Sequence, residues 1–483
     1  MADEPALHSR PSVQKRTSSE RTKTNNDDLP LPKIKQLTPQ ATYANGSDPS
    51  DLNLPQQILH RKESTDLDDY FVGPRSLDRH SKWPSFLRIH GSVMPRMIVP
   101  MLFMACWSTL IAVVSDKVRP LGISSILLTV LGFVVGLALS LRSSTAYERY
   151  AEGRKYWAAL MQASRTIARI IWIHTLEREG EEGKDDLLAK LSGINLIVAF
   201  SVALKHKLRF EPDFAYEDLA GLIGHLDTFA KAAHGDPAVS TTPKPGTLKA
   251  VGSYLGLPFA MSNPRKAIKR SRKPLGNLPL EILSYLSSYI DTIITNGTLV
   301  HPVYQSQAGA ALVALDDVMT GTERVLNTPL PLAYTILISQ ISWIYVMILP
   351  FQLVADLGYI SIPGALVGTY IIHGLAAICA EIENPFGNDV NDLPLAVFCA
   401  QIAADLDIIT STPPPQPDNF MKTEANKVLF PLSRSGANIW KARSVEDIRA
   451  ALKAKATIAP STFSEGNREK VLEARGRGSP EMA

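Results

Sequence analysis

Four long apolar stretches dominate the hydropathy pattern of this chain. The first two, Met97 to Val114 and Leu121 to Leu141, contain no charged residue. The third lies within the uncharged segment Asn327 to Ala355, and the fourth, Leu357 to Ala380, includes a single histidine, His373. Because about 20 helical residues cross a bilayer core, each stretch is long enough, and the pattern predicts four transmembrane helices.

Basic residues are placed asymmetrically around these stretches. They occur at 82–96, before the first stretch, and at 142–155, after the second, whereas the loops within each pair are very short. Positive residues favour the cytosolic side. We therefore expect both termini and the region from 142 to 325 to be cytosolic, with two helical hairpins entering the membrane from that side and the plasma membrane as the default location.

Polar ends enclose this pattern. Residues 1–79 are too polar to bury a core and are predicted to form a disordered tail. The tail 413–483 is predicted to be largely disordered, with one short helix capped by Ser444, three residues before Asp447. A Pro- and Gly-rich insert at 231–279 contains a basic run, which suits a solvated loop, an acidic lipid surface or a nuclear signal.

The segments outside the membrane have helical periodicity. From Tyr147 to Thr175 the apolar residues recur on one broad face, and Leu278 to Ile294 follows the same pattern. Leu191 to Leu204 is uncharged but short, which predicts a core helix. The sequence thus indicates an all-α membrane protein. The expected segments are transmembrane helices at 80–145 and 326–380, a helical cytosolic domain at 146–325 and a C-terminal helical segment at 381–412.

Composition and motifs narrow the functional classes. The formal net charge is only +3 among 97 lysine, arginine, aspartate and glutamate residues, which argues against a nucleic-acid partner. The three cysteines cannot form a disulfide framework. No HExxH, P-loop, GxSxG or paired CxxC motif occurs. We therefore predict that the chain is not an enzyme and requires no cofactor.

Three motifs resemble those of the bestrophin family of anion channels, especially its bacterial and fungal branches. They are Leu131 to Tyr150, Asn327 to Thr335, and Glu381 to Leu395, whose Asn-Pro-Phe-Gly block is the most specific. The resemblance covers roughly residues 83 to 410. It implies a homopentamer in the lipid bilayer, four transmembrane helices and a helical cytosolic domain in each subunit, and one axial pore for anions such as chloride.

The second apolar stretch is the best candidate for a pore-lining helix. Thr129, Phe133 and Leu137 recur at helical spacing and form one stripe. The residues alone also allow this stripe to face lipid or another helix, whereas the resemblance assigns it to a narrow pore neck. An adjacent stripe of small residues would let neighbouring helices approach closely, and it consists of Gly132, Gly136 and Ser140.

Two further positions concern the ends of the pore. Arg142 follows the stripe by about one turn, so that five copies would form a positive ring that attracts anions; a membrane-interface position is the alternative. Leu330 lies between two prolines just before the third stretch. The residues indicate only a stiff turn there, but the resemblance implies a second constriction, a cytosolic aperture.

The acidic block after the fourth stretch has two interpretations. Glu381, Asn384, Asp389 and Asp392 match positions that form a calcium clasp in animal bestrophins, and oxygen ligands suit calcium. The acidic run is sparser here, however. We therefore favour a structural role, in which Asn384 begins a turn and Asp392 caps the next helix; calcium is possible but not required.

Three functions compete. The leading one is passive anion conduction through the pore. A secondary anion transporter is the first alternative, although His373 is the only clearly titratable group within the apolar stretches. A non-conducting membrane scaffold that uses the long tails for partners is the second.

Overall fold

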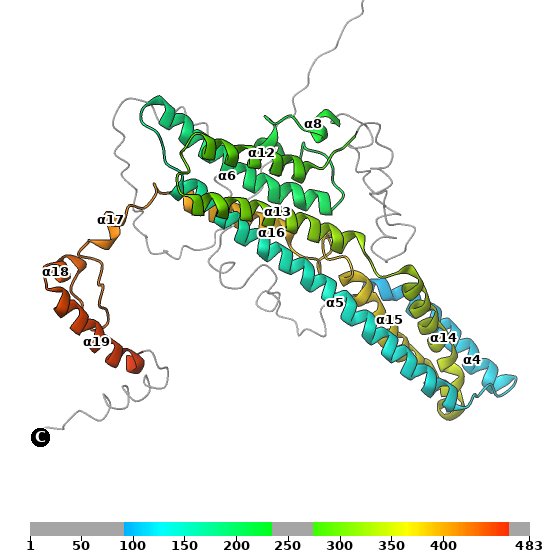
Figure 1. Ribbon diagram of the computed structural model, residues 1–483. Coiled ribbons are helices and arrows are strands. Elements are labelled where there is room, and N and C mark those ends of the chain that lie inside the picture. Colours follow the sequence, from blue (N-terminus) through cyan, green and yellow to red (C-terminus); the bar gives the residue numbers. More distant parts are fainter. Residues whose placement is uncertain (1–90, 234–273, 463–483) are drawn as a thin grey trace, which may run out of the picture. The chain divides into compact units, whose positions relative to one another are not determined.

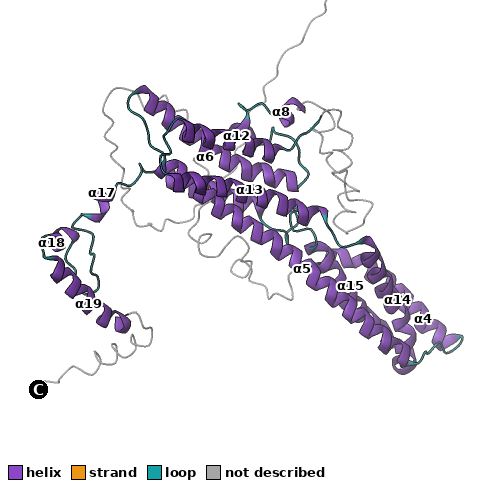
Figure 2. Cartoon of the chain, in the orientation of Figure 1, coloured by secondary structure: helices purple, strands orange, loops and turns teal. Residues whose placement is uncertain are grey.

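The computed structural model describes residues 91–233 and 274–462, which contain helices and loops but no strand (Figure 2). The predicted all-α class is confirmed for this part of the chain. The α-helices are α4 (Met94–Lys117), α5 (Ser125–Arg169), α6 (Glu181–Leu208), α7 (Glu217–Ile223), α8 (Phe229–Ala233), α12 (Leu278–Thr295), α13 (Pro302–Asn327), α14 (Leu332–Leu357), α15 (Ser361–Ile382), α16 (Leu395–Thr410), α17 (Pro417–Met421), α18 (Ala437–Lys441) and α19 (Val445–Thr462).

The four predicted transmembrane stretches lie in α4, the first half of α5, α14 and α15, which pack against one another (Figure 1). Length and apolar composition allow α4 and α5 to cross a membrane, and the same holds for the segment Leu332–Ile382. A short 3₁₀ turn, Gly358–Ile360, divides that segment into α14 and α15. The indole nitrogen of Trp107 donates to the Met347 carbonyl at 3.0 Å, which ties α4 to α14.

The helix α6 also has the length and composition of a membrane span, but its surroundings differ. Of the 18 most apolar consecutive residues of α6, 61% are buried inside the chain, compared with 28% of the corresponding residues of α4. A helix that faces lipid exposes its apolar side chains, whereas α6 buries them against α12 and α16. The prediction of a core helix at Leu191 to Leu204 is therefore confirmed.

A second group of helices, the helical domain, comprises α6, α7, α12, α13, α16 and the second half of α5. The predicted apolar face of Tyr147 to Thr175 lies in its core: Trp157, Leu160 and Ile167 are fully buried. The rings of Trp157 and Phe398 lie 5.9 Å apart, which joins α5 to α16. The predicted helix at Leu278 to Ile294 is α12, and its apolar side packs on α6.

Two glycines let other elements approach α5 closely. A Cβ atom on Gly321 would lie 2.2 Å from the Tyr156 ring, so α13 needs glycine where it meets α5. A Cβ atom on Gly153 would lie 3.0 Å from the ring of Phe386, which belongs to the Asn-Pro-Phe-Gly block and is fully buried. The most specific motif of the sequence thus packs directly on α5.

The predictions for the polar segments have mixed outcomes. The tail 1–79 and most of the insert 231–279 lie outside the described residues. The start of the C-terminal tail differs from the prediction of one short helix, because two further helices, α17 and α18, precede the expected one, α19. The expected cap at Ser444 is present, since its hydroxyl accepts from the Asp447 amide at 3.1 Å.

Candidate pore neck and aperture

The stripe predicted on the second membrane helix lies on the uncovered side of α5. Phe133 is 74% exposed and Leu137 is 54% exposed, and Thr129 is exposed as well. The opposite side carries Leu128 and Val135, each 3% exposed, and packs on the chain's own α14 and α15. Phe133 and Leu137 are therefore exposed large apolar side chains on a membrane helix, and they can contact lipid, another subunit or the interior of a pore.

The small residues beside the stripe divide into two environments. A Cβ atom on Gly132 would lie 3.2 Å from the Tyr345 ring of α14, so this glycine serves packing within the subunit. Gly136 has no neighbouring atom within 4 Å of such a Cβ atom. Close helix packing is therefore present at Gly132, against α14, whereas the surface of α5 at Gly136 contacts no other described element.

The environment of Arg142 differs from both interpretations made from the sequence, a positive ring in the pore and a position at the membrane interface. Its side chain is buried, and its guanidinium lies 3.8 Å from a carboxylate oxygen of Glu383 at the end of α15. A charge buried in this way forms neither an open positive ring nor an interfacial contact with lipid headgroups. The reason is geometric: Arg142 continues the buried side of α5, in line with Val135 and Leu139.

The turn that carries Leu330 is held by an arginine that the sequence analysis did not single out. The Arg149 guanidinium donates to three backbone carbonyls, those of Val325, Thr328 and Glu383; the last of these bonds is 2.9 Å long. Burial lowers the pKa of Arg149, but an arginine starts so high that it stays charged. One side chain of α5 therefore fixes the end of α13, the turn and the end of α15 together.

Glu383 completes this arrangement from the other side. Its carboxylate accepts from the Leu330 amide at 3.2 Å and also faces Arg142. The candidate neck helix and the candidate aperture turn thus meet at one carboxylate. Arg149 and Glu383 lie inside the motifs at 131–150 and 381–395, but only their contacts across 234 residues of sequence reveal what they do.

A cavity of about 370 Å³ borders the turn, between the second half of α5 and the end of α13. Arg149 and Arg324 contribute positive charge to its wall, and Arg324 pairs with Glu152. Leu330 itself is half-buried. The approach to the turn is therefore polar and contains cationic groups, whereas the neighbouring stripe of α5 is apolar.

The acidic block contacts the start of α4 through an arginine. Arg96 donates to Glu381 at 2.8 Å and to Asp389 at 3.0 Å, so its guanidinium lies between two of the four residues that match the calcium clasp. The Asn391 amide donates to Glu381 at 2.6 Å and to the Gly91 carbonyl at 2.9 Å. Within the described ranges, no group of three or more His, Cys, Asp or Glu residues is placed to hold a metal ion.

Asp392 does not cap α16 as expected. That helix begins after Pro394 with no capping side chain. The buried carboxylate of Asp392 instead accepts from the Asp389 amide at 2.7 Å and closes the turn of the acidic block. Asn384 is exposed at the start of this turn. The structural role is thus a turn and not a helix cap, because two residues, one of them a proline, separate Asp392 from the first residue of α16.

His373 lies within the membrane helices. It is 9% exposed, and its ring centroid is 4.4 Å from that of Trp343 on α14. Its Nε2 atom makes no hydrogen bond to a described residue. The one histidine of the fourth stretch is therefore enclosed by its own subunit.

Comparison with known proteins places the chain. Residues 74–407 match a family described as bacterial/fungal bestrophin proteins. The voltage-dependent anion channel-forming protein sll1024 of Synechocystis is 31% identical over 68% of this chain and 91% of the relative. The protein YneE of Salmonella typhi, which has the same description, is 28% identical over 66% of this chain and 88% of the relative.

The fold of this chain is also similar to solved structures. A mutant of a bacterial bestrophin homologue from Klebsiella pneumoniae is 23% identical and covers 66% of this chain and all of that one, with a TM-score of 0.48. The family match spans more than two thirds of the chain and includes the α5 stripe, the Leu330 turn and the acidic block. The chain is therefore a member of the bacterial and fungal bestrophin family.

Proposed function

We propose that this protein is an anion channel that conducts passively, with chloride as a permeant ion. The relatives named above are described as anion channel-forming proteins, which supports this function and agrees with the prediction that the chain is not an enzyme. The observation that carries the proposal is the exposure of Phe133 and Leu137 on α5, because a membrane helix with exposed large apolar side chains suits a pore shared between subunits.

The channel is a homopentamer in which α5 of each subunit lines the axial pore. Thr129, Phe133 and Leu137 form the neck, and the apolar side chains limit conduction because water leaves a narrow apolar pore easily. Leu330 forms a second constriction on the cytosolic side. The cations at the cavity beside it, Arg149 and Arg324, favour anions at that end.

A bilayer recording tests conduction directly. The purified protein is reconstituted in a planar bilayer with a chloride gradient and equal pH on both sides. We expect a current whose reversal potential follows the chloride gradient. In a second recording with a pH difference across the bilayer, a reversal potential that follows the proton gradient would favour the transporter, for which the enclosed His373 is the specific supporting observation. Absence of current from the intact protein would favour the scaffold.

Calcium independence is the next expected result. The Arg96 guanidinium already bonds both Glu381 and Asp389, so a divalent ion would have to displace it to bind these two carboxylates. The current should be the same in calcium and in a calcium chelator. Asp392→Ala should lower the free energy of unfolding by about 1–3 kcal/mol, because it removes a buried acceptor, and should leave this insensitivity unchanged.

A calcium dependence of the current would contradict this prediction. A calcium-dependent current that disappears in a well-folded Asp389→Ala, Asp392→Ala double variant would establish a calcium site here. Glu446→Ala is the matched control, since Glu446 is an exposed carboxylate on α19.

The orientation in the membrane can be tested at Asn296. This residue begins the sequon Asn-Gly-Thr and is exposed at the end of α12. Because we place the helical domain in the cytosol, Asn296 should carry no glycan when the protein is made in a eukaryotic host. Mass spectrometry of the peptide that contains it provides the measurement, and a glycan there would reverse the proposed orientation.

A further inference from the structure

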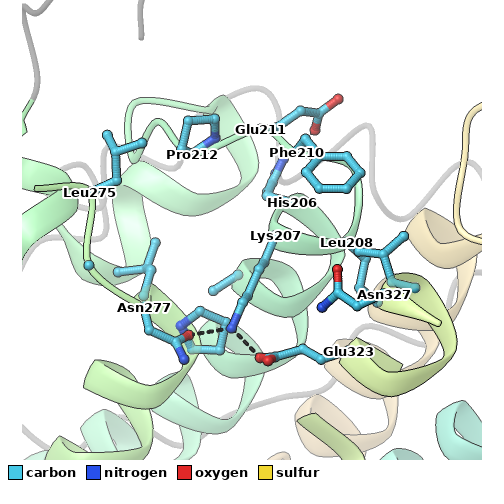
Figure 3. Close-up of a pocket in the computed structure, with 15 residues that line it drawn as sticks. His206, Lys207, Leu208, Phe210, Glu211, Pro212, Leu275, Asn277, Glu323 and Asn327 are labelled. Atoms are coloured by element: carbon cyan, nitrogen blue, oxygen red, sulfur yellow. Dashed lines mark hydrogen bonds and ion pairs between the residues drawn. The ribbon is translucent and has the colours of Figure 1, made fainter. Parts of the chain in front are cut away.

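The helical domain contains a cavity that shares no residue with the α5 stripe or the Leu330 turn. Its volume is about 220 Å³, and it lies among the end of α6 with the loop that follows, the start of α12 and the last turn of α13 (Figure 3). Sites for drug-sized ligands have volumes of about 300–1,000 Å³. A ligand that fits this cavity is therefore smaller than a drug-sized molecule.

One end of the cavity carries opposite charges side by side. The Lys207 ammonium donates to the Asn277 amide oxygen at 2.7 Å and pairs with Glu323 of α13 (Figure 3). An ammonium has three N–H donors, so one donor is left for a ligand. The side chains of Lys207 and Glu323 are 29% and 32% exposed, so both can be reached from the cavity.

Two further polar groups at this end are available. Asn277 is the residue before α12, but its side chain bonds Lys207 and does not cap the helix. The N-terminus of α12 therefore borders the cavity without a capping side chain, although Glu281 in its first turn offsets the positive end of the helix dipole. The Asn327 side chain also lines the cavity and makes no hydrogen bond to a described residue.

The walls of the cavity are apolar. Leu208, Phe210, Leu275 and Leu326 contribute to them, together with Pro212. Phe210 has a backbone φ of +59°, in the left-handed region that non-glycine residues rarely adopt. Such a conformation costs about 1–3 kcal/mol and persists where the surroundings require it. Here it holds the loop after α6 beside the cavity.

The remaining charges near the cavity are already matched. His206 lies 2.7 Å from Glu211 and 3.0 Å from Asp218. Burial alone would lower the pKa of His206, but these two hydrogen bonds outweigh it and raise the pKa above the ordinary value. Lys205 also pairs with Asp218. Lys207 and Glu323 are thus the oppositely charged pair that lines the cavity from two different helices, α6 and α13.

These charges select the ligand class. A lone carboxylate near Lys207 would also meet Glu323, and a lone ammonium near Glu323 would also meet Lys207. A molecule whose carboxylate and ammonium are one carbon apart can replace the internal pair with two pairs of its own. We propose that this cavity binds a small α-amino acid with an apolar side chain, its carboxylate held by Lys207 and Asn327 and its ammonium by Glu323.

Binding can be measured without any current, so this proposal stands or falls separately from the proposed function. The purified full-length protein in detergent is titrated with L-leucine and L-phenylalanine by calorimetry and by its thermal unfolding midpoint. We expect saturable binding and a higher midpoint. The matched probes 4-methylpentanoate and 3-methylbutylamine, which lack the ammonium or the carboxylate of leucine, should bind at least about tenfold more weakly.

Two variants locate the site. Asn327→Ala removes an amide without an internal partner and should weaken leucine binding about tenfold, with the unliganded midpoint unchanged. Asn419→Ala is the control, because Asn419 is exposed on α17 and does not line the cavity. The proposal is overturned if neither amino acid binds saturably up to about 10 mM, if 4-methylpentanoate binds as tightly as leucine, or if the two variants behave alike.

Discussion

Truncation of Phe133 to alanine should raise the open probability of the channel by at least about tenfold, which corresponds to about 1.4 kcal/mol. Phe133 is the bulkiest residue of the α5 stripe and touches little of its own subunit. In a pentamer five rings would meet at one level of the pore, and their removal would widen and wet the neck. Leu137→Ala should act in the same direction. Single-channel recording measures both effects.

The control for this experiment is Val134→Ala. Val134 is also exposed on α5, but it lies about 100° around the helix from Phe133. Its truncation should leave gating unchanged. Preference for anions over cations should survive in all three variants, because an apolar ring limits access and the charges beyond it set the sign. Unchanged gating in well-assembled Phe133→Ala channels would exclude Phe133 from the pore.

Replacement of Arg149 by glutamine should loosen the Leu330 turn. The arginine donates to three carbonyls, and a bond from a charged donor contributes about 1.5–3 kcal/mol. Glutamine has only two N–H donors, both on one nitrogen, so it must lose at least one of the three bonds, and we expect the free energy of unfolding to fall by at least about 1.5 kcal/mol. We also expect large organic anions to gain permeability relative to chloride, as read from reversal potentials.

Two companion variants separate charge from geometry. Arg149→Lys keeps the charge but not the planar fork of donors, so it should rescue stability only in part. Arg154→Lys is the control: Arg154 is exposed and lies over the Phe398 ring, a contact that lysine can also make. If Arg149→Gln and Arg154→Lys gave the same permeability ratios, Arg149 would have no role in positioning the turn.

Much of the fold could be predicted because its signals are local. The uncharged runs identify α4, α14 and α15, and the helical spacing of Trp157, Leu160 and Ile167 identifies the buried side of α5. Flanking charges and shortness separated α6 from the membrane helices. The helix capped by Ser444, α19, was predicted, but α17 and α18 were not, because helices of five residues carry little periodicity and depend on local turns and caps.

The site was predictable only in part. The α5 stripe follows from spacing, but the direction of Arg142 follows from which side of α5 the other helices cover. Arg149 and Glu383 were ordinary charges in the sequence, and their roles arise where α5, α13 and α15 meet. The same holds for Arg96, which precedes the acidic block by 285 residues and still reaches Glu381.

The length of α5 has a consequence for how the channel can move. This helix has 45 residues and spans about 68 Å at 1.5 Å per residue, with no internal proline or break. Its first half carries the stripe and its second half is clamped into the core of the helical domain. Because α5 is one continuous helix, a rotation of its first half about the helix axis would also rotate Trp157 and the other buried residues of its second half. If α5 lines the pore as proposed, opening by rotamer changes of the neck side chains, or by a tilt of α5 as a whole, would leave this packing intact.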